Sequence, residues 1–450
     1  MPSCCTGRHS FYILLSVKIK NSKIINAWCM YDWANSVYSL VITSAIFPAY
    51  YQAVTVSTQG NDEVNFFGFP IINSVLYSYS LSFSFLFVGV FLPLLSGIAD
   101  YSGKKRLFLK IFTYLGALAC GGLFLYDGTN VEWGILCSTT ASIGYSGSLV
   151  FYDAYLPEIA DKNTMDRVSA RGYSFGYIGS IILLLLNLFT ITNYDLFGLS
   201  SELEATRYAF LTVCLWWIGF SLIPFTVLPK NVFNKKPTGN YLYSGYQEII
   251  KVFKSLKDLP VIKMFLISFF FYNMGVQTVM YMAGTFAIKE LGMSTNLLIV
   301  TIMIIQIVAI IGAYAFAVLS EKRGNKTSIQ LMIIIWIGLC LVAYIVKTEL
   351  QFILLAFGVG LVMGGIQSLS RSTYSKLIPT DSQDHASFFS FYDVTFSVSV
   401  VIGTFSYGLV EQLTNSMRNS TLVLASYFMI GFVLLYFTKM KNFGKLEKSS

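Results

Sequence analysis

The stretch Gly97-Ile98-Ala99-Asp100-Tyr101-Ser102-Gly103-Lys104-Lys105-Arg106 follows a long apolar segment, and a related stretch follows another apolar segment later in the chain. The second copy is Val318-Leu319-Ser320-Glu321-Lys322-Arg323-Gly324-Asn325-Lys326. In each copy an acidic residue precedes a glycine by three positions, and basic residues follow the acid. A polar turn repeated after equivalent apolar segments predicts that the chain is built from two related halves.

The composition of the 450-residue chain is that of a membrane protein. Hydrophobic residues make up 55% of it, charged residues only 12%, and the mean hydropathy is +0.63, whereas about a quarter of the residues of a soluble domain are charged. A hydrocarbon core about 30 Å thick needs about 20 apolar residues per helix. We therefore predict an all-α polytopic membrane protein with twelve transmembrane helices, at residues 27–51, 73–97, 107–126, 131–154, 171–192, 207–228, 261–286, 295–319, 328–346, 351–375, 386–411 and 419–438.

Basic residues fall almost entirely on one side of these predicted helices. Only four of the 31 lysines and arginines lie on the other side, which leaves 27 on the side of the N-terminus. Because cytoplasmic loops carry an excess of Lys and Arg, this asymmetry supports the count of twelve and predicts that both termini are cytoplasmic. The net charge of +8 is then explained by loops that face anionic lipid, and it does not indicate nucleic-acid binding. The four exceptions are Arg207, Lys289, Lys347 and Arg418.

The predicted helices divide into two pseudo-symmetric bundles of six. We predict a cytoplasmic leader at 1–26, interfacial or disordered, then a first bundle at 27–228, a cytoplasmic connector at 229–260, a second bundle at 261–438 and a cytoplasmic tail at 439–450. Two further matches support the repeat. Tyr31-Asp32-Trp33-Ala34 matches Tyr272-Asn273-Met274-Gly275, and residues 152–169 match residues 374–387. Parallel halves of this kind form a recognised transporter architecture.

The stretch 97–106 resembles the loop signature of the major facilitator superfamily, although Ser96 stands where that signature usually has its first glycine. A more specific set of motifs resembles the vacuole-effluxer-like branch of this superfamily, which is named after an autophagy-related yeast protein. The resemblance covers residues 25–435 and implies a major facilitator fold and a rocker-switch transporter. The amino-acid efflux ascribed to eukaryotic members is a weaker implication, because substrate changes easily within a superfamily. The motifs are Trp28-Cys29-Met30-Tyr31-Asp32-Trp33-Ala34-Asn35-Ser36, Leu156-Pro157-Glu158-Ile159-Ala160, Arg167-Val168-Ser169-Ala170-Arg171-Gly172 and Gly364-Gly365-Ile366-Gln367-Ser368-Leu369-Ser370-Arg371-Ser372.

Side-chain amides recur inside the predicted helices. Amides offer hydrogen-bond donors and acceptors without the cost of a fixed charge, so they suit a site for a small zwitterionic or polyhydroxylated solute. The alternative is that they form interhelical hydrogen bonds worth about 0.6–2 kcal/mol each. The candidate solute-binding residues are Asn35, Asn187, Asn273, Gln277, Gln306 and Gln367.

Four charged residues, Asp32, Asp153, Arg371 and Asp393, lie in the cytoplasmic third of their predicted helices. Three acids cannot all be neutralised by one arginine, so one of them is expected to hold a proton. One hypothesis is that Asp32 or Asp393 takes up a proton that is coupled to solute movement. The other is a cytoplasmic gate, in which Arg371 pairs with Asp32 or Asp393 while the inner mouth is closed. The two are compatible if protonation releases the gate.

The loop motif Gly97, Asp100, Gly103, Lys104, Lys105 and Arg106 is predicted to control conformation. An acid near the N-terminus of another helix is stabilised by the helix dipole, and by analogy with the superfamily this contact locks the halves in one state. Glycines 172, 176 and 179 do not follow a predicted strand, so close helix packing explains them better than a nucleotide loop.

The sequence contains no Walker motif, no nucleophile–base pair and no cysteine or histidine spacing typical of a metal site, so we expect no catalytic residues, no cofactor and no enzyme activity. The leading hypothesis is a proton-coupled secondary transporter of a small polar organic solute, with amino acids as one candidate, working as a monomer in a bacterial inner membrane. The alternative is a receptor or scaffold that keeps the transporter fold without flux. Expected partners are the solute, protons and membrane lipid.

Overall fold

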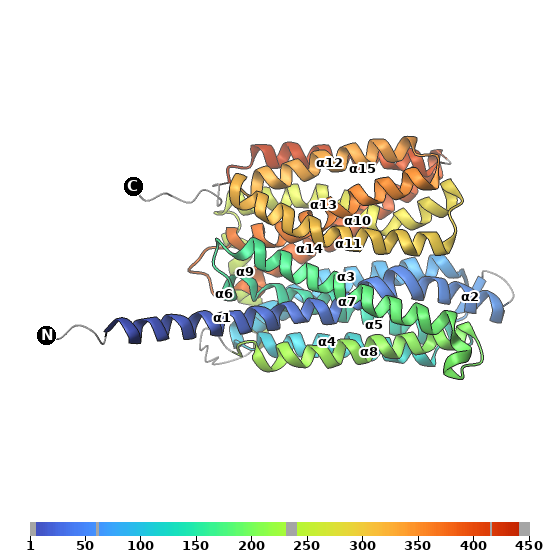
Figure 1. Cartoon of the computed structure of the whole chain (residues 1–450), viewed down its shortest axis with the longest axis horizontal. Coiled ribbons are helices and arrows are strands. Elements are labelled where there is room, and N and C mark those ends of the chain that lie inside the picture. The colour runs from blue at the N-terminus through green and yellow to red at the C-terminus, as the bar shows by residue number, and fades with distance from the viewer. Residues whose placement is uncertain (1–5, 60–62, 231–240, 415, 441–450) are drawn as a thin grey trace.

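The computed structural model describes residues 6–59, 63–230, 241–414 and 416–440 of the chain. Long helices run side by side along one direction and form two groups (Figure 1). The first group comes from the first part of the chain, drawn in blue to green, and the second from the later part, drawn in yellow to red. We call these groups the first half and the second half.

Each half contains six spanning segments, which confirms the predicted fold class. In the first half they are α1 (Thr6–Val37) with its continuations η1 (Tyr38–Ile46) and α2 (Phe47–Gln59), then α3 (Asn73–Ser102), α4 (Lys105–Gly122), α5 (Val131–Asp153), α7 (Met165–Thr192) and α8 (Glu202–Val227). In the second half they are α10 (Pro260–Leu291), α11 (Thr295–Arg323), α12 (Asn325–Ile345), α13 (Glu349–Leu377), α14 (His385–Thr414) and α15 (Met417–Phe437). Short elements between them are the hairpin β1 (Glu63–Phe66) and β2 (Phe69–Ile72), η2 (Leu123–Leu125), α6 (Leu156–Ile159), η3 (Tyr194–Phe197) and α9 (Tyr241–Ser255).

Eleven helices in the described part of the chain are long and apolar enough to cross a membrane on their own composition. The remaining spanning segment is α5, which contains four serines and three glycines. Its side chains are mostly buried against other helices, so protein rather than lipid surrounds it. A helix in that position does not need a fully apolar surface.

Several elements differ from the sequence expectation. Several helices extend beyond the predicted apolar spans, for example α3, which continues to Ser102, and α7, which begins at Met165. Residues 6–26 of the predicted leader are helical and continuous with the first span, which was not expected. The first span contains the π-helical segment η1, the loop after it forms a β-hairpin, and the polar connector contains α9. Apolar patterning alone predicts none of these three features.

The first described helix starts, and the last described helix ends, at the same end of the bundle. The start of α1 and the end of α15 appear together in Figure 1, and Lys326 donates from its Nζ to the carbonyl oxygens of Tyr436 and Thr438 at 2.7 and 2.9 Å. Because most loop lysines and arginines gather here, we call this the basic end. The positive-inside rule predicts that it faces the cytoplasm.

The two halves meet along a seam formed by crossed pairs of equivalent helices. Helix α3 of the first half packs against α14 of the second, and α11 of the second packs against α7 of the first. In each pair the second spanning helix of one half meets the fifth of the other. This exchange is the packing expected of two parallel repeats related by an axis along the membrane normal.

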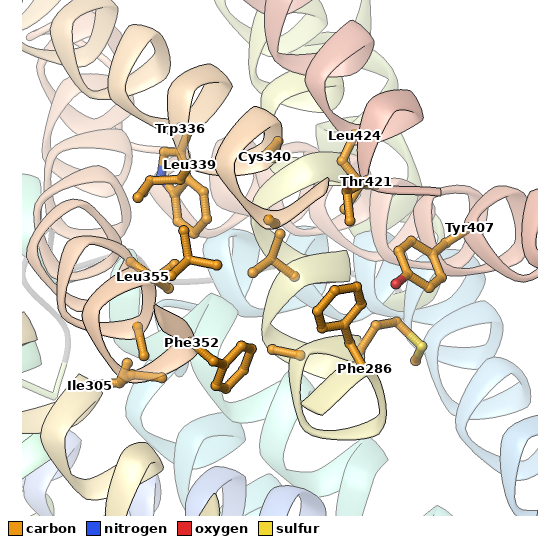
Figure 2. A pocket seen from close by; sticks show the side chains of 16 residues that line it. Phe286, Ile305, Trp336, Leu339, Cys340, Phe352, Leu355, Tyr407, Thr421 and Leu424 are labelled. Carbon is orange, nitrogen blue, oxygen red and sulfur yellow. The ribbon is translucent and has the colours of Figure 1, made fainter. Parts of the chain in front are cut away.

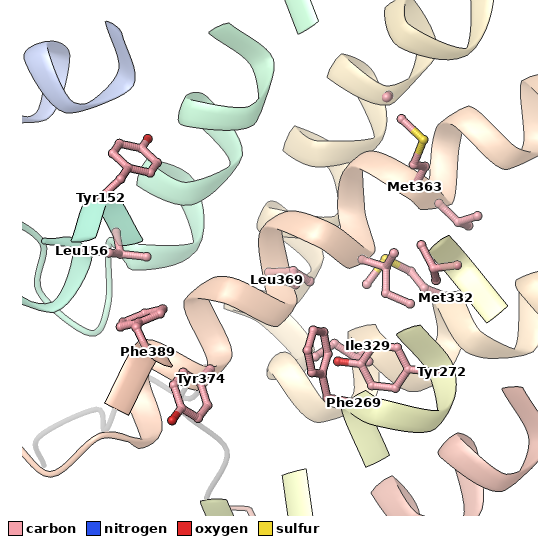
Figure 3. Packing of buried hydrophobic residues seen from close by; sticks show 14 of the residues in the cluster. Tyr152, Leu156, Phe269, Tyr272, Ile329, Met332, Met363, Leu369, Tyr374 and Phe389 are labelled. Carbon is pink, nitrogen blue, oxygen red and sulfur yellow. The ribbon is translucent and has the colours of Figure 1, made fainter. Parts of the chain in front are cut away.

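Apolar packing is continuous across the seam at the basic end. Tyr152 and Leu156 of the first half belong to the same buried cluster as Tyr374 and Phe389 of the second half, and Figure 3 shows how these side chains lie between the two groups of helices. The rings of Tyr374 and Phe389 meet edge to face at 5.4 Å. The halves are therefore held together at this end by a shared core.

Glycines allow close backbone contact between helices. A Cβ atom added at Gly364 of α13 would lie 2.0 Å from the carbonyl oxygen of Ala309 in α11. In α7, added Cβ atoms at Gly172, Gly176 and Gly179 would meet side-chain or backbone atoms of α1 within 3.0 Å. This contact confirms that the three glycines of α7 serve close helix packing.

We predict that Gly364→Leu destabilises the protein, because α11 and α13 must separate to admit the side chain, at a cost of about 1–3 kcal/mol or more. The measurement is thermal unfolding of the purified protein in detergent. Gly338→Leu on α12 is the matched control, because a Cβ there meets nothing within 4 Å. Equal melting temperatures for the two variants would contradict the packing argument.

Candidate functional site

A buried arginine of the second half is bonded to two acids of the first half at the basic end of the seam. Arg371 on α13 donates to Asp153 Oδ1 on α5 at 3.1 Å and, from both terminal nitrogens, to Asp32 Oδ2 on α1 at 3.3 Å. It also donates to the hydroxyl and the carbonyl oxygen of Ser169 on α7 at 3.0 and 2.9 Å. Arg371 is 2% exposed, so its charge is neutralised by the other half of the protein.

Aromatic side chains surround this ion pair. The Arg371 guanidinium lies over the rings of Tyr173 at 4.2 Å and Trp28 at 4.8 Å, and such contacts are attractive for a cation. Tyr152 donates its hydroxyl to Asp32 Oδ2 at 2.7 Å. A Cβ at Gly172 would lie 2.4 Å from Asp32 Oδ2, so only glycine leaves room for the acid beside α7.

A third acid of the first half, Asp166, is enclosed by the second half. Asp166, at the start of α7, accepts from Lys376 Nζ at 2.6 Å and from Asn325 Nδ2 at 2.8 Å. The hydroxyls of Ser320 and Ser372 each donate to it at 2.7 Å. Asp166 and Lys376 are both buried, which makes this a fully bonded ion pair between the halves. We call it the Asp166 node.

The acid of the loop motif caps a helix of the opposite half. Asp100, near the end of α3, accepts from the backbone N–H groups of Ala386 and Ser387 at 3.2 and 2.6 Å. These residues form the first turn of α14, where the helix dipole is positive. The geometry is the one that the sequence argument predicts for this residue, while its role in conformational change stays a proposal.

Three charged or titratable groups form a further bridge at the basic end. Glu158 in α6 is bonded to Lys105 of α4 and lies 3.0 Å from His385 Nδ1 at the start of α14. Burial raises the pKa of Glu158, but the positive charge of Lys105 and the bond to His385 outweigh it and leave that pKa below its ordinary value. Glu158 therefore stays ionised at neutral pH.

The remaining residues of the loop motif shape the turn. Gly103 ends α3 with a positive φ of 65°, a left-handed conformation that favours glycine. Lys104 follows it, and Arg106 donates to the carbonyl oxygen of Leu228 at 2.7 Å. A Cβ at Gly97 would lie 2.2 Å from the carbonyl oxygen of Gly245, so this glycine allows the connector helix α9 to pack on α3.

The third predicted acid does not join the arginine. Asp393 on α14 is 9% exposed, and within the described residues its Oδ2 has no hydrogen-bond partner. Arg371 pairs with Asp32 and Asp153 instead. Of the two partners that the sequence argument offers for a gate, the structure brings only Asp32 to the arginine.

The predicted amide residues differ in how fully their side chains are hydrogen-bonded. Gln367 joins the halves, because Tyr177 of α7 donates to its Oε1 at 2.7 Å. Asn273 donates to Ser399 at 2.6 Å and accepts from Gln277, so this pair bonds α10 to α14 inside the second half.

The other amides are less fully bonded. Asn187 accepts from Thr212 at 2.8 Å within the first half. Asn35, Asn187 and Gln306 each keep one buried polar atom without a partner among the described residues. Unpaired buried amides are costly, so these atoms are available to a solute or to water.

The second half also contains a cavity of about 60 Å³ between its own helices. Figure 2 shows its lining of aromatic and aliphatic side chains, among them Phe286, Trp336, Phe352 and Leu355. None of the predicted amides or acids lines it. Its apolar lining does not match a polar solute, whereas the seam holds the predicted residues Asp32, Asp153 and Arg371 and is the candidate site.

Sequence reasoning missed Asp166, Lys376 and Ser169 as functional residues. Asp166 and Lys376 stand close to helix ends, where charged residues are usually solvated, and nothing in their spacing shows that they meet. A usable signal existed in the repeat, because residues 152–169 match residues 374–387 and include Asp166 and Ser169.

We predict that Asp166→Asn strongly destabilises the protein, because Lys376 is left buried without a counter-charge, at a cost of about 3–5 kcal/mol. Lys376→Met in the same chain should recover much of the loss. Thermal unfolding in detergent measures both effects. The control is Arg167→Gln, which removes the neighbouring exposed pair with Glu321 and should cost about 0–1 kcal/mol. Similar losses for the two single variants would contradict this account.

We predict that Glu158→Gln destabilises the protein at neutral pH and that the difference from the native chain shrinks on acidification. Because the folded-state pKa of Glu158 is lowered, its stabilisation is complete above the unfolded pKa of about 4.3 and is lost as the pH falls through the folded value. Unfolding measured from pH 7 to about 3 tests this. Glu321→Gln, at a more exposed carboxylate, is the control, and a pH-independent difference for Glu158→Gln would refute the prediction.

Comparisons with known proteins agree with this architecture. A family model described as vacuole effluxer Atg22 like matches residues 20–448. An uncharacterised transporter of the major facilitator type from Bacillus subtilis, YxiO, is 30% identical over 92% of this chain and 94% of its own length. Autophagy-related protein 22 of Saccharomyces cerevisiae is 26% identical over 76% of this chain and 74% of its own.

Solved structures share the fold. The proton:xylose symporter XylE superposes with a TM-score of 0.73 at 14% identity, covering 95% of this chain and 98% of that one. The fucose:proton symporter FucP of Escherichia coli superposes with a TM-score of 0.64 at 14% identity, covering 94% and 99%. The arrangement of two six-helix halves, the family match and these relatives lead to one conclusion: the chain belongs to the Atg22-like vacuole effluxer family and is a multi-pass membrane transporter of the major facilitator type.

Proposed function

We propose that the chain is a proton-coupled secondary transporter that moves a small polar organic solute by alternating access, and that the contacts around Arg371 form its gate at the basic end. In this proposal the basic end faces the cytoplasm of a bacterial cell, as the distribution of lysine and arginine predicts. The two halves rock about the seam, and a solute site between them opens to one side at a time.

The observation that carries the proposal is the pairing of Arg371 with Asp32 and Asp153 across the seam. Each half alone would hold uncompensated buried charge, so the halves are stabilised together at this end. The Asp166 node and the cap that Asp100 provides for α14 act in the same place. Opening the basic end requires all three sets of contacts to separate, which is the work expected of a gate.

The balance of charge supports the proposed proton coupling. Asp32 holds Arg371 in place, and its neutralisation by a proton would weaken the ion pair. Asp393 is buried with no cation bonded to it among the described residues, so a proton is a natural partner. Uptake of a proton at either acid would then change the equilibrium between closed and open states of the gate.

The polar groups inside the helix bundle suit a small organic solute. Gln367, Asn35 and Gln306 offer amide donors and acceptors, and the tyrosines near Arg371 add rings with polar tips. Amino acids are one candidate class. Two solved structures that share the fold are of sugar–proton symporters, which fits a polar solute but does not identify it.

The test is transport by the full chain in proteoliposomes with an imposed pH gradient. Metabolites that differ inside and outside cells with and without the gene identify a pool of candidate solutes, and mass spectrometry measures their uptake. We expect gradient-dependent accumulation, and we expect Asp32→Asn and Asp393→Asn each to uncouple uptake from the gradient. Asp195→Asn, at an exposed position on η3, is the control and should transport normally.

Two results would contradict the proposal. Fully coupled uptake by both variants would remove these acids from the mechanism. Binding of a solute by the native chain without any gradient-dependent accumulation would favour a receptor or scaffold that keeps the transporter fold.

A further inference from the structure

Arg371, the buried arginine of the seam, has no donor left for a solute. A guanidinium has five N–H groups, and Arg371 makes five hydrogen bonds to Asp32, Asp153 and Ser169. A carboxylate or phosphate on the solute could bind Arg371 only by breaking the gate contacts. While the basic end is closed, this cation is therefore unavailable to an anionic solute.

The acidic residues of the same region, in contrast, are not all paired with a positive charge. Asp32 and Asp153 share the one guanidinium, and Asp393 stands apart from it on α14. Asp393 is nine-tenths buried, its Oδ2 lacks a hydrogen-bond partner among the described residues, and Asp153 across the seam is close enough to interact with it electrostatically. The region thus has a place for one more positive charge.

Two features around Asp393 fit a ligand better than a sealed core. Ser397 lies one helical turn further along the same face of α14, and its buried hydroxyl also lacks a partner among the described residues. Tyr392, the preceding residue of α14, stacks on Phe269 with ring centroids 4.3 Å apart, and aromatic rings attract organic cations. A carboxylate, a free hydroxyl and a pair of rings together suit an ammonium group on a small organic molecule.

We propose that the transported solute carries a positive charge and that its ammonium group and a proton compete for the carboxylate of Asp393. This inference rests on the proposed transport function and specifies its substrate class. In the exchange, the protonated carboxyl of Asp393 releases its proton, and the carboxylate binds the ammonium group that replaces it. One positive charge leaves and one enters, so the region keeps the same net charge throughout. Competition at one site couples the two flows in opposite directions.

The experiment uses the purified full chain in detergent and three probes of similar shape: 2-phenylethylamine, 2-phenylethanol and 3-phenylpropionate, with agmatine as a second, non-aromatic cation. Calorimetry measures binding, and a pH indicator in weak buffer measures proton release. We expect the amines to bind, each bound amine to release up to one proton, and the affinity to fall about tenfold for each unit of acidification in the range where Asp393 is protonated.

Variants at Asp393 test whether amine binding and proton release both depend on this residue. Asp393→Asn should weaken amine binding by about a hundredfold or more and abolish proton release. Asp393→Glu, which keeps the charge, should retain proton release with altered affinity, and it keeps the test valid if the asparagine variant folds poorly. Asp195→Asn at an exposed site should behave as the native chain does.

The outcomes separate this inference from the transport proposal. Binding of the alcohol or the carboxylate as tightly as the amines, absence of amine binding, or amine binding without proton release would each overturn the inference. If the pH gradient drives uptake of a neutral or anionic solute in proteoliposomes, the transport function stands and the assignment of a cationic substrate fails. If amines bind and release protons but are not accumulated, the site is correct and the transport proposal fails.

Discussion

A charge buried in the middle of a membrane protein must be paired, and in this transporter the partner of the buried arginine belongs to the other half of the molecule. Arg371 comes from the second half, and both of its acids come from the first. Neither half can neutralise these particular buried charges by itself. The cost of an unpaired buried ion, several kcal/mol, therefore acts across the seam and makes the closed basic end a distinct state.

The contacts across the seam differ in kind, and the difference matters for movement. The Arg371 pair and the Asp166 node are buried and strongly bonded, whereas the Arg167–Glu321 pair is exposed to solvent and contributes little. The apolar cluster that contains Tyr152, Tyr374 and Phe389 also stabilises the closed end, through burial of apolar surface that does not depend on bond direction. A transporter that alternates between two states needs contacts that break together. Buried ion pairs satisfy this condition, because each loses most of its stabilising free energy when water enters.

Much of the fold can be predicted from the apolar pattern of the sequence, but several elements cannot. The twelve spanning segments and the repeat of two halves follow from segment length and from the positions of lysine and arginine. The helix α9 was not predicted, because a short amphipathic helix in a polar connector lacks a long apolar run. The π-helical segment η1 was not predicted either, since it shares the composition of the α-helix around it. The node around Asp166 was missed because its five members are separated by up to 210 residues along the chain.

The sequence by itself determined the class of the protein, because the cost of placing polar backbone and charged side chains in hydrocarbon acts locally on every segment of about 20 residues. It also singled out Asp32, Asp153, Arg371 and Asp393, since charge inside an apolar helix is conspicuous wherever it occurs. Only the tertiary structure decided which of these acids meets the arginine and which is left alone. That choice depends on the relative rotation and depth of four helices from two halves, and the spacing of residues within one helix carries no information about its neighbours.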